Sequence, residues 1–251
     1  MRILNGSAAN VGSGETTAVT GGLEYTGASD WKGAARLELR DSTASSSVLS
    51  TLGAAFKLSD EWTALGRNLL TITRQHEAAS KTEDWLQFGM AYREQAANKT
   101  NALLRAEYRT EDVTDPVAGD SGRRVAVVSA HASHQLNPQT QLSARVAAKW
   151  ARDRSLGLDS RETTHLLSAR ATHDFAPRWD LGLQAAALIG ASGHARQLGL
   201  GVEAGYLLAD NLWVSVGWNV FGFTDRDLTA QDNTQRGFYI RLRFKFDEAL
   251  F

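Results

Sequence analysis

The sequence predicts an all-β fold, an antiparallel up-and-down transmembrane β-barrel of about 14 strands. Apolar and polar residues alternate along most of the 251 residues, and only β-strands sort side chains with a period of two. Tight turns alternate with longer polar connections, and aromatic residues gather where the expected strands end. A soluble sandwich would place more aromatics in mid-strand and use more large aliphatic residues. The three observations together therefore favour a bilayer-spanning barrel.

The closing stretch "GFYIRLRFKF" shows the alternation most clearly, with Phe238, Ile240 and Leu242 on one parity and basic residues on the other. The same pattern indicates about 13 clear strands of roughly 9–12 residues, a length that suits a tilted membrane strand. The segment 64–74 fits least well, because Asn68 falls on its apolar parity. The alternating rows lie around 17–25, 31–39, 48–58, 64–74, 86–92, 102–108, 142–150, 179–189, 198–208, 212–220 and 238–246. Ser129, His131 and Ser133 belong to a further strand, and His165 and His173 share another.

The connections set the direction of each strand. "TGASDW", "KLSDEW", "LNPQT", "FAPRW" and "LADNLW" are tight turns, whereas "QHEAASKTED", "RTEDVTDPVAGDSGRR", "RDRSLGLDSRE" and "TDRDLTAQDNTQR" are longer. Short turns at one rim and long loops at the other place the turns in the periplasm and the loops outside the cell. The strand 17–25 then needs an ascending neighbour, and residues 1–11 are the candidate, which gives 14 strands. The alternative is 12 strands that begin near Trp31.

Composition bounds the class of protein. The 27 basic and 28 acidic residues nearly cancel, which disfavours a nucleic-acid partner. The absence of cysteine excludes disulfides and thiolate metal sites. No apolar run approaches the ~18 residues of a membrane-spanning helix, and the N-terminus lacks the apolar core of a signal peptide. We expect one outer-membrane barrel domain over residues 1–251.

Aromatic residues are expected to form a girdle at each membrane interface. One set borders the tight turns, and a second set lies beside the long loops. The predicted girdle comprises Trp31, Trp62, Trp179, Trp213, Tyr25, Phe56, Phe175 and Tyr206 at the tight-turn rim, with Trp85 and Trp150 at the other rim.

The inward parity carries most of the chemistry, because basic residues dominate it. Two interpretations are open: an arginine-rich pore that concentrates anions, or a closed ladder of Arg–Glu pairs. The compensating acids outside this wall are expected mainly in outer loops, among them Asp225 and Asp227. The predicted basic wall is Lys32, Arg36, Arg40, Lys57, Arg67, Arg93, Arg105, Arg109, Arg145, Lys149, Arg170, Arg241, Arg243 and Lys245, and the lumen acids are Glu38, Glu107 and Glu203.

Enzyme chemistry finds little support. His131 and His134 point to opposite faces of a strand and cannot hold one metal ion. Ser129, His131 and Ser133 share a face, so a hydrolase stays open as a lesser alternative, but no carboxylate is assigned to orient the imidazole. "GLGVEAG" lacks the spacing of a dinucleotide loop, and its glycines more simply make room for bulky inward neighbours. We expect no enzyme activity, no cofactor and no metal.

The stretch "NLWVSVGWNVFGFTDRDLTAQDNTQRGFYIRLRFKFDE" resembles the C-terminal barrel of large multi-repeat outer-membrane and surface proteins of Gram-negative bacteria. "TAVTGGLEYTG", "LLSTLGAAFKLSDEWT" and "LQFGMAYRE" are similar to the same group. The resemblance implies an outer-membrane anchor and an assembly signal, read by the barrel-assembly machinery, at Phe246 or Phe251. It carries no catalytic residue.

The sequence thus predicts a barrel that anchors an N-terminal region absent from this chain. Display or export of that region is a further expectation. A narrow anion-preferring porin is the alternative. The expected partners are outer-membrane lipid, the barrel-assembly machinery and, for an open lumen, small anions.

Overall fold

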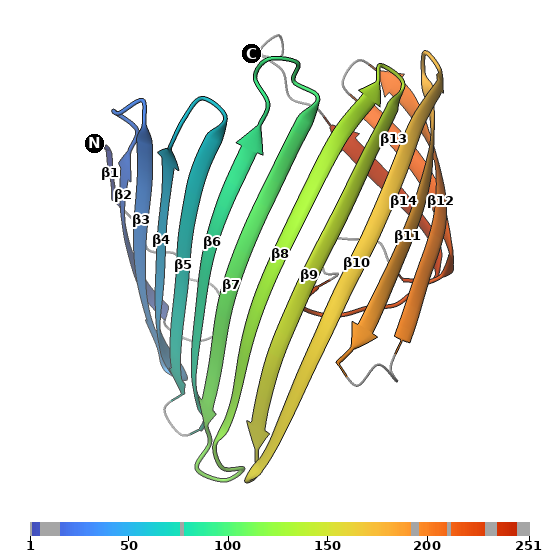
Figure 1. Cartoon of the computed structure of the whole chain (residues 1–251). Helices are drawn as coiled ribbons and strands as arrows, with labels where there is room; N and C mark the ends of the chain where they lie inside the picture. The colour runs from blue at the N-terminus through green and yellow to red at the C-terminus, as the bar shows by residue number, and fades with distance from the viewer. Residues whose placement is uncertain are drawn as a thin grey trace. The chain divides into compact units, whose positions relative to one another are not determined.

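The computed structural model describes residues 2–5, 16–75, 78–191, 196–209, 212–228 and 235–244, and none of these residues lies in a helix. Figure 1 shows successive strands running side by side in chain order. The strands are β1 (Arg2–Asn5), β2 (Thr16–Tyr25), β3 (Trp31–Ser42), β4 (Ser45–Lys57), β5 (Trp62–Gln75), β6 (Ser80–Arg93), β7 (Thr100–Thr114), β8 (Ser121–Asn137), β9 (Thr140–Ser155), β10 (Leu158–Ala176), β11 (Trp179–Gly190), β12 (Arg196–Ala209), β13 (Leu212–Phe221) and β14 (Gly237–Phe244).

In the described part of the chain, 14 strands form one sheet in the order of the sequence, which confirms the predicted up-and-down architecture and agrees with the predicted count of about 14. The pairs from β1–β2 to β5–β6 and from β10–β11 to β13–β14 are antiparallel. The 12-strand alternative is wrong, because β1 pairs with β2, where Arg2 lies opposite Glu24. The chain divides into two compact units, which we describe separately. The first comprises residues 1–95, 103–128 and 150–162, and the second comprises the remainder.

Alternation gives the sheet of each unit an apolar face and a polar face. In the first unit, Leu52 and Phe88 are exposed on the apolar face. In the second, Leu183, Val202 and Trp218 form one exposed row across β11, β12 and β13. The opposite parity of the same three strands carries the buried polar residues Asp180, Glu203, Ser215 and Asn219.

Asn68 interrupts the apolar face of the first unit, as its parity predicted. It lies between Leu52 of β4 and Leu86 of β6. Its side-chain Nδ2 donates a hydrogen bond to Asp84 Oδ1 at 2.6 Å. A neighbouring strand thus supplies the acceptor that an amide needs on an apolar surface.

The segment "RDRSLGLDSRE" differs from its prediction as a long loop. β9 and β10 continue through it and leave a turn of two residues, Leu156 and Gly157, with φ values of 51° and 78°. Positive φ at both central residues is typical of a type I′ turn, which matches the twist of a hairpin. Cross-strand pairs extend the ladder here, including Arg123–Asp153 on the polar face and Arg152–Asp159. A run of polar residues does not by itself distinguish a loop from a strand that is exposed to water on both faces.

Candidate functional site

The polar face of the sheet is the candidate functional site, and it carries the predicted basic wall. Each described member of that wall lies on the strand parity opposite the exposed apolar rows. Lys245 lies outside the described residues, as do the predicted assembly-signal residues Phe246 and Phe251. Most of these cations have carboxylate partners, so the wall is compensated to a large extent.

Two strands of the first unit share an Arg-x-Glu-x-Arg pattern, which places three charged side chains on one face. In β3, Glu38 pairs with Arg36 at 3.0 Å and with Arg40 at 2.8 Å. In β7, Glu107 is buried and takes both Arg105 and Arg109 as ion-pair partners. One carboxylate thus neutralises part of the charge of two guanidinium groups in each strand.

Trp85 adds to the β7 cluster from the polar face of β6. Its indole Nε1 donates to Glu107 Oε2 at 2.8 Å. The guanidinium carbon of Arg109 lies 4.4 Å from the centre of the indole ring, a cation–π arrangement. Trp85 therefore belongs to the charged cluster, although its place beside a polar connection had suggested a girdle residue.

Glu203 organises the polar face of the second unit. Its carboxylate accepts hydrogen bonds from Arg170 Nη2 and Tyr239 Oη, both at 2.8 Å, and pairs with Arg241 at 3.3 Å. These partners come from β10 and β14, which are separated from β12 by β11 and β13 respectively. Glu203, Arg170 and Arg241 belong to the predicted lumen charges, whereas Tyr239 was not predicted.

Glycines on the intervening strands make this reach across the sheet feasible. A Cβ at Gly182 of β11 would lie 3.4 Å from Arg170 Nη2, and one at Gly217 of β13 would meet the Tyr239 ring. Farther along the same face, Gln184 Nε2 donates to Asn219 Oδ1 at 2.6 Å over Gly201. Gly199 and Gly205 likewise face Phe223 and Asp180, which confirms the prediction that the glycines of "GLGVEAG" accommodate bulky neighbours.

We expect Gly217→Ala to lower the free energy of unfolding by about 1–3 kcal/mol, because the added methyl group displaces Tyr239 from Glu203. Gly21→Ala is the matched control, since no atom lies within 4 Å of the position that its methyl group would take. That control should be neutral or stabilise by about 0.5–1 kcal/mol through lower backbone entropy of the unfolded chain. Urea titration of both refolded variants measures the difference, and equal effects would contradict the proposed close approach.

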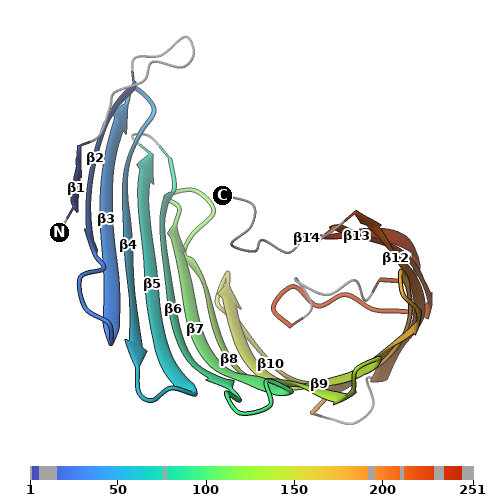
Figure 2. The ribbon, with the colours of Figure 1, turned by 90° about the horizontal axis from the view of Figure 1, so that it is seen from above.

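Residues 222–228, which follow β13, fold onto the polar face of the second unit. Figure 2 shows this part of the chain on the concave side of β11–β13. Lys149 Nζ donates to Asp225 Oδ2 at 2.6 Å and lies 3.9 Å from Asp227 Oδ2, and all three side chains are buried. Asp225 and Asp227 lie in the connection between β13 and β14, as expected, but they are buried against Lys149 and do not face solvent. A lysine buried on the sheet supplies the charge that draws both carboxylates inward.

Acid should loosen this segment. Burial alone raises the pKa of the Asp225 carboxyl, but hydrogen bonds from Lys149 and from the N–H groups of Leu228 and Asp227 outweigh it and lower that pKa. A carboxyl with a lowered folded-state pKa stabilises above its unfolded value of about 3.9 and loses that contribution as pH falls through the folded pKa. We expect proteolysis after residue 221 to increase when pH falls below about 4, monitored with an acid-active protease. Asp225→Asn should be cleaved readily at pH 7 and should show a smaller acid response.

The predicted aromatic girdle is brought together within each unit. At the tight-turn rim of the first unit, Trp31 stacks on Tyr25 with ring centres 4.2 Å apart, and Phe56 follows at 6.3 Å. In the second unit, Trp179 contacts Tyr206 at 4.7 Å and Phe175 at 6.5 Å. Trp62 pairs at 4.9 Å with Tyr92, which the sequence analysis had not included.

Two other tryptophans of the predicted girdle lie on different faces of the sheet. Trp150 is exposed on the apolar face, as expected of a girdle residue. Trp213 shares its parity with Ser215 and Asn219 on the polar face, and its indole Nε1 is buried without a hydrogen-bond partner among the described residues. The bulge between Leu207 and Ala209, where β12 pairs with β13, lies beside Trp213.

The histidines do not assemble a reactive centre in the described part of the chain. Ser129 and Ser133 are buried, whereas His131 is exposed. His134 Nδ1 and His173 Nδ1 instead make hydrogen bonds of 2.9 and 3.0 Å with Thr100 and Thr140 on neighbouring strands. Within the described ranges, no group of three or more His, Asp or Glu side chains could hold a metal ion.

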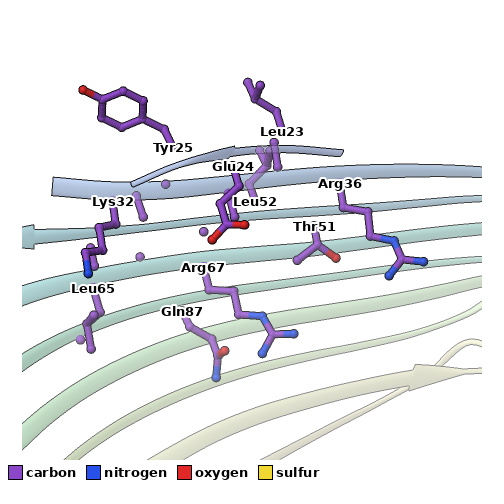
Figure 3. A pocket seen from close by; sticks show the side chains of 18 of the residues that line it. Leu23, Glu24, Tyr25, Lys32, Arg36, Thr51, Leu52, Leu65, Arg67 and Gln87 are labelled. Atoms are coloured by element: carbon purple, nitrogen blue, oxygen red, sulfur yellow. The ribbon is translucent and has the colours of Figure 1, made fainter. Parts of the chain in front are cut away.

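A basic pocket of about 840 Å³ lies on the polar face of the first unit. Figure 3 shows Lys32, Arg36 and Arg67 on the same side of the sheet, with Leu23 and Tyr25 on the other side. Arg105, Gln87 and one acid, Glu24, also line the pocket. Lys32 and Arg67 make no ion pair within the described residues, so this is the least compensated part of the wall.

Comparison with known proteins supports the fold. Neither a family model nor a curated protein sequence matches the chain. Solved structures do: the siderophore receptors PirA of Pseudomonas aeruginosa and PirA of Acinetobacter baumannii each superpose with a TM-score of 0.71 at 8% identity. The alignments cover 82% and 86% of this chain, respectively, and 41% and 42% of the receptors. The alcaligin outer-membrane receptor FauA of Bordetella pertussis gives 0.60 at 9% identity, over 92% of this chain and 48% of the receptor.

The strand arrangement and these likenesses define the class of fold, that of outer-membrane β-barrels. The chain spans less than half the length of the receptors it matches, and at this identity the likeness concerns the fold alone. Among the described residues, no helix has the length and apolarity required to cross a membrane.

Proposed function

We propose that this chain is a β-barrel of the bacterial outer membrane, with the apolar face against lipid and the polar face around the lumen. One observation carries the proposal. On adjacent strands of the second unit, the apolar side chains are the exposed ones: Leu183 is 61% exposed, Leu198 66% and Val216 53%. Contiguous exposed apolar surface of this extent is rare on water-soluble monomers and is typical of a lipid-facing band.

The aromatic clusters support this placement. Trp31, Trp62 and Trp179 all lie at the first residue of a strand that follows a tight turn. Such residues favour the level of the lipid headgroups, because one part of the ring is apolar and the indole N–H is polar. In our proposal the tight turns face the periplasm, and the longer β7–β8 and β9–β10 hairpins extend outside the cell.

The barrel serves, in this proposal, to anchor an N-terminal region that lies outside this chain, and to display or export it. The compensated polar face supports an anchor over a transport pore. Glu38, Glu107 and Glu203 each hold two arginines, and Lys149 holds two aspartates. Paired charges weaken the field that would select an ion. Insertion by the barrel-assembly machinery belongs to the same proposal.

A narrow anion-preferring channel is the second candidate, and the basic pocket of the first unit favours it. Lys32 and Arg67 are uncompensated there, and Arg36 is more than half exposed despite its pairing with Glu38. If water fills the lumen, these cations would attract permeating anions in a confined, weakly screened field.

Fractionation and conductance test the proposal together. The refolded chain should need detergent, should migrate differently on gels before and after boiling, and should show no steady conductance in a planar bilayer. A steady anion-selective current that Lys32→Glu with Arg67→Glu inverts, while Arg178→Glu at a tight turn leaves it unchanged, would favour the channel instead. A protein that is monodisperse in water without detergent would contradict both candidates.

A further inference from the structure

A patch of arginines lies on the apolar-face side of the first unit, at the ends of β8, β9 and β10. These ends adjoin the β7–β8 and β9–β10 hairpin tips, which lie together at the lower edge of Figure 1. Arg124 of β8 shares its parity with Val128, and Arg152 and Arg154 of β9 share theirs with Trp150. All three arginines are exposed, and so is Arg161 of β10. We call Arg124, Arg152, Arg154 and Arg161 the arginine patch.

The arginine patch carries an excess of positive charge. Arg152 Nε binds both carboxylate oxygens of Asp159, at 2.9 and 3.0 Å, and Arg161 lies 3.9 Å from the same carboxylate. Asp112 and Asp120 border the recess at this patch, so four guanidinium groups face three carboxylates. Within the described residues, Arg124 and Arg154 make no hydrogen bond or ion pair. Two cations are therefore available to an external anion.

On the polar face of the same strand ends, the charges are paired. There Arg123 Nη1 donates to Asp153 Oδ1 at 3.3 Å, so an arginine of β8 and an aspartate of β9 compensate each other. The uncompensated arginines thus lie on the side of the sheet that carries the exposed apolar rows.

Members of the arginine patch line a recess whose side chains could bind an anion. A pocket of about 590 Å³ is bordered by Arg124, Arg152, Arg154 and Asp112. Three glycines also border it and add no side chains to its walls: Gly119, Gly122 and Gly157. The planar guanidinium group presents two parallel N–H donors, which match the oxygens of a phosphate group. A phosphate group presents more acceptor oxygens than a carboxylate does, so it accepts from several arginines at once.

The position of the arginine patch along the strands indicates that the phosphate belongs to a lipid headgroup. Trp150 is exposed on the apolar face, and Arg152 is the next residue of β9 on that face. One such step rises roughly 7 Å along a strand. Tryptophan favours the headgroup level of a bilayer, so the arginine patch lies at or just beyond the level of the lipid phosphates.

We propose that the arginine patch, through Arg124, Arg152 and Arg154, binds the phosphate groups of an anionic lipid headgroup in the outer leaflet. The inference rests on the proposed membrane location. It goes beyond the anchor role, because it assigns a specific lipid partner chemistry to one sector of the barrel surface. Arg152 is partly held by Asp159 and positions the site, while Arg124 and Arg154 supply the unpartnered charge.

Lipid binding by the full chain, refolded in detergent micelles, tests the inference. The probes are diphosphorylated lipid A, the same glycolipid after enzymatic removal of its phosphates, and inorganic phosphate. We expect wild-type protein to bind the diphosphorylated lipid, with affinity falling as salt rises. Arg124→Gln with Arg154→Gln should weaken that affinity at least about tenfold. The matched control, Arg67→Gln with Arg178→Gln, removes the same charge from the polar face and a tight turn and should leave the affinity unchanged.

Three outcomes would overturn the inference: equal weakening by the control pair, equal affinity for the dephosphorylated lipid, or inorganic phosphate that competes at micromolar concentration and so marks a free-anion site. If the double variant does not refold, the single variants and the salt dependence of wild-type binding decide the question. Heat-modifiable migration of each sample monitors the barrel separately. A folded wild-type barrel that ignores lipid A refutes the lipid site and leaves the proposed function standing, whereas a chain that is soluble without detergent refutes the proposed function.

Discussion

Leu183→Arg should lower the free energy of unfolding in a bilayer by about 2–4 kcal/mol, the cost of placing arginine on a lipid face near the midplane. Leu183 is exposed on the apolar face and follows the girdle residue Trp179 by four residues of β11. At a strand rise of ~3.3 Å and a tilt of ~40°, it lies roughly 10 Å inside the interface. Reversible urea unfolding in lipid vesicles, followed by tryptophan fluorescence, measures the change.

Leu65→Arg is the control. Leu65 is also an exposed leucine, but it lies on the polar face, on the same face of β5 as Arg67. Because Leu65 is 41% exposed, water solvates the new guanidinium and only modest repulsion from nearby cations remains, so we expect a cost below about 1 kcal/mol. If Leu65→Arg is the more damaging substitution, the two faces are reversed, and a soluble barrel becomes the better description.

Glu203→Gln should destabilise the second unit by about 2–4 kcal/mol. The substitution keeps the shape of the side chain and an acceptor for Tyr239, but it leaves Arg170 and Arg241 without their shared counter-charge. Removing one member of a buried ion pair costs several kcal/mol, because the remaining charge stays desolvated. Both arginines retain some exposure, which keeps the expected value at the lower end of that range.

Glu38→Gln makes the same chemical change in a wetter setting. Its partners Arg36 and Arg40 are both more than half exposed, so water can solvate them once the carboxylate is gone. We expect a loss below about 1 kcal/mol, as for exposed ion pairs. Equal losses from the two variants would show that burial does not control the strength of these clusters.

The sequence by itself determined the strands, their two faces and the side-chain types on each. A period of two assigns every residue of a strand to one face, whatever its neighbours are, so β14 and the row Leu181, Leu183 and Ala185 could be read directly. The glycines of β12 were predictable for the same reason, since a glycine on a face of large residues implies close neighbours. The Arg-x-Glu-x-Arg pattern of β3 and β7 also implied pairing within one strand.

Only the tertiary structure decided which charges meet across strands. Glu203 reaches arginines on β10 and β14 because register places Gly182 and Gly217 between them, and register depends on hydrogen bonding between strands rather than on any local pattern. The inward fold of Asp225 onto Lys149 likewise joins residues 76 positions apart. Local sequence cannot distinguish a solvated aspartate from one drawn to a buried lysine, because desolvation and pairing act only once the strands have assembled.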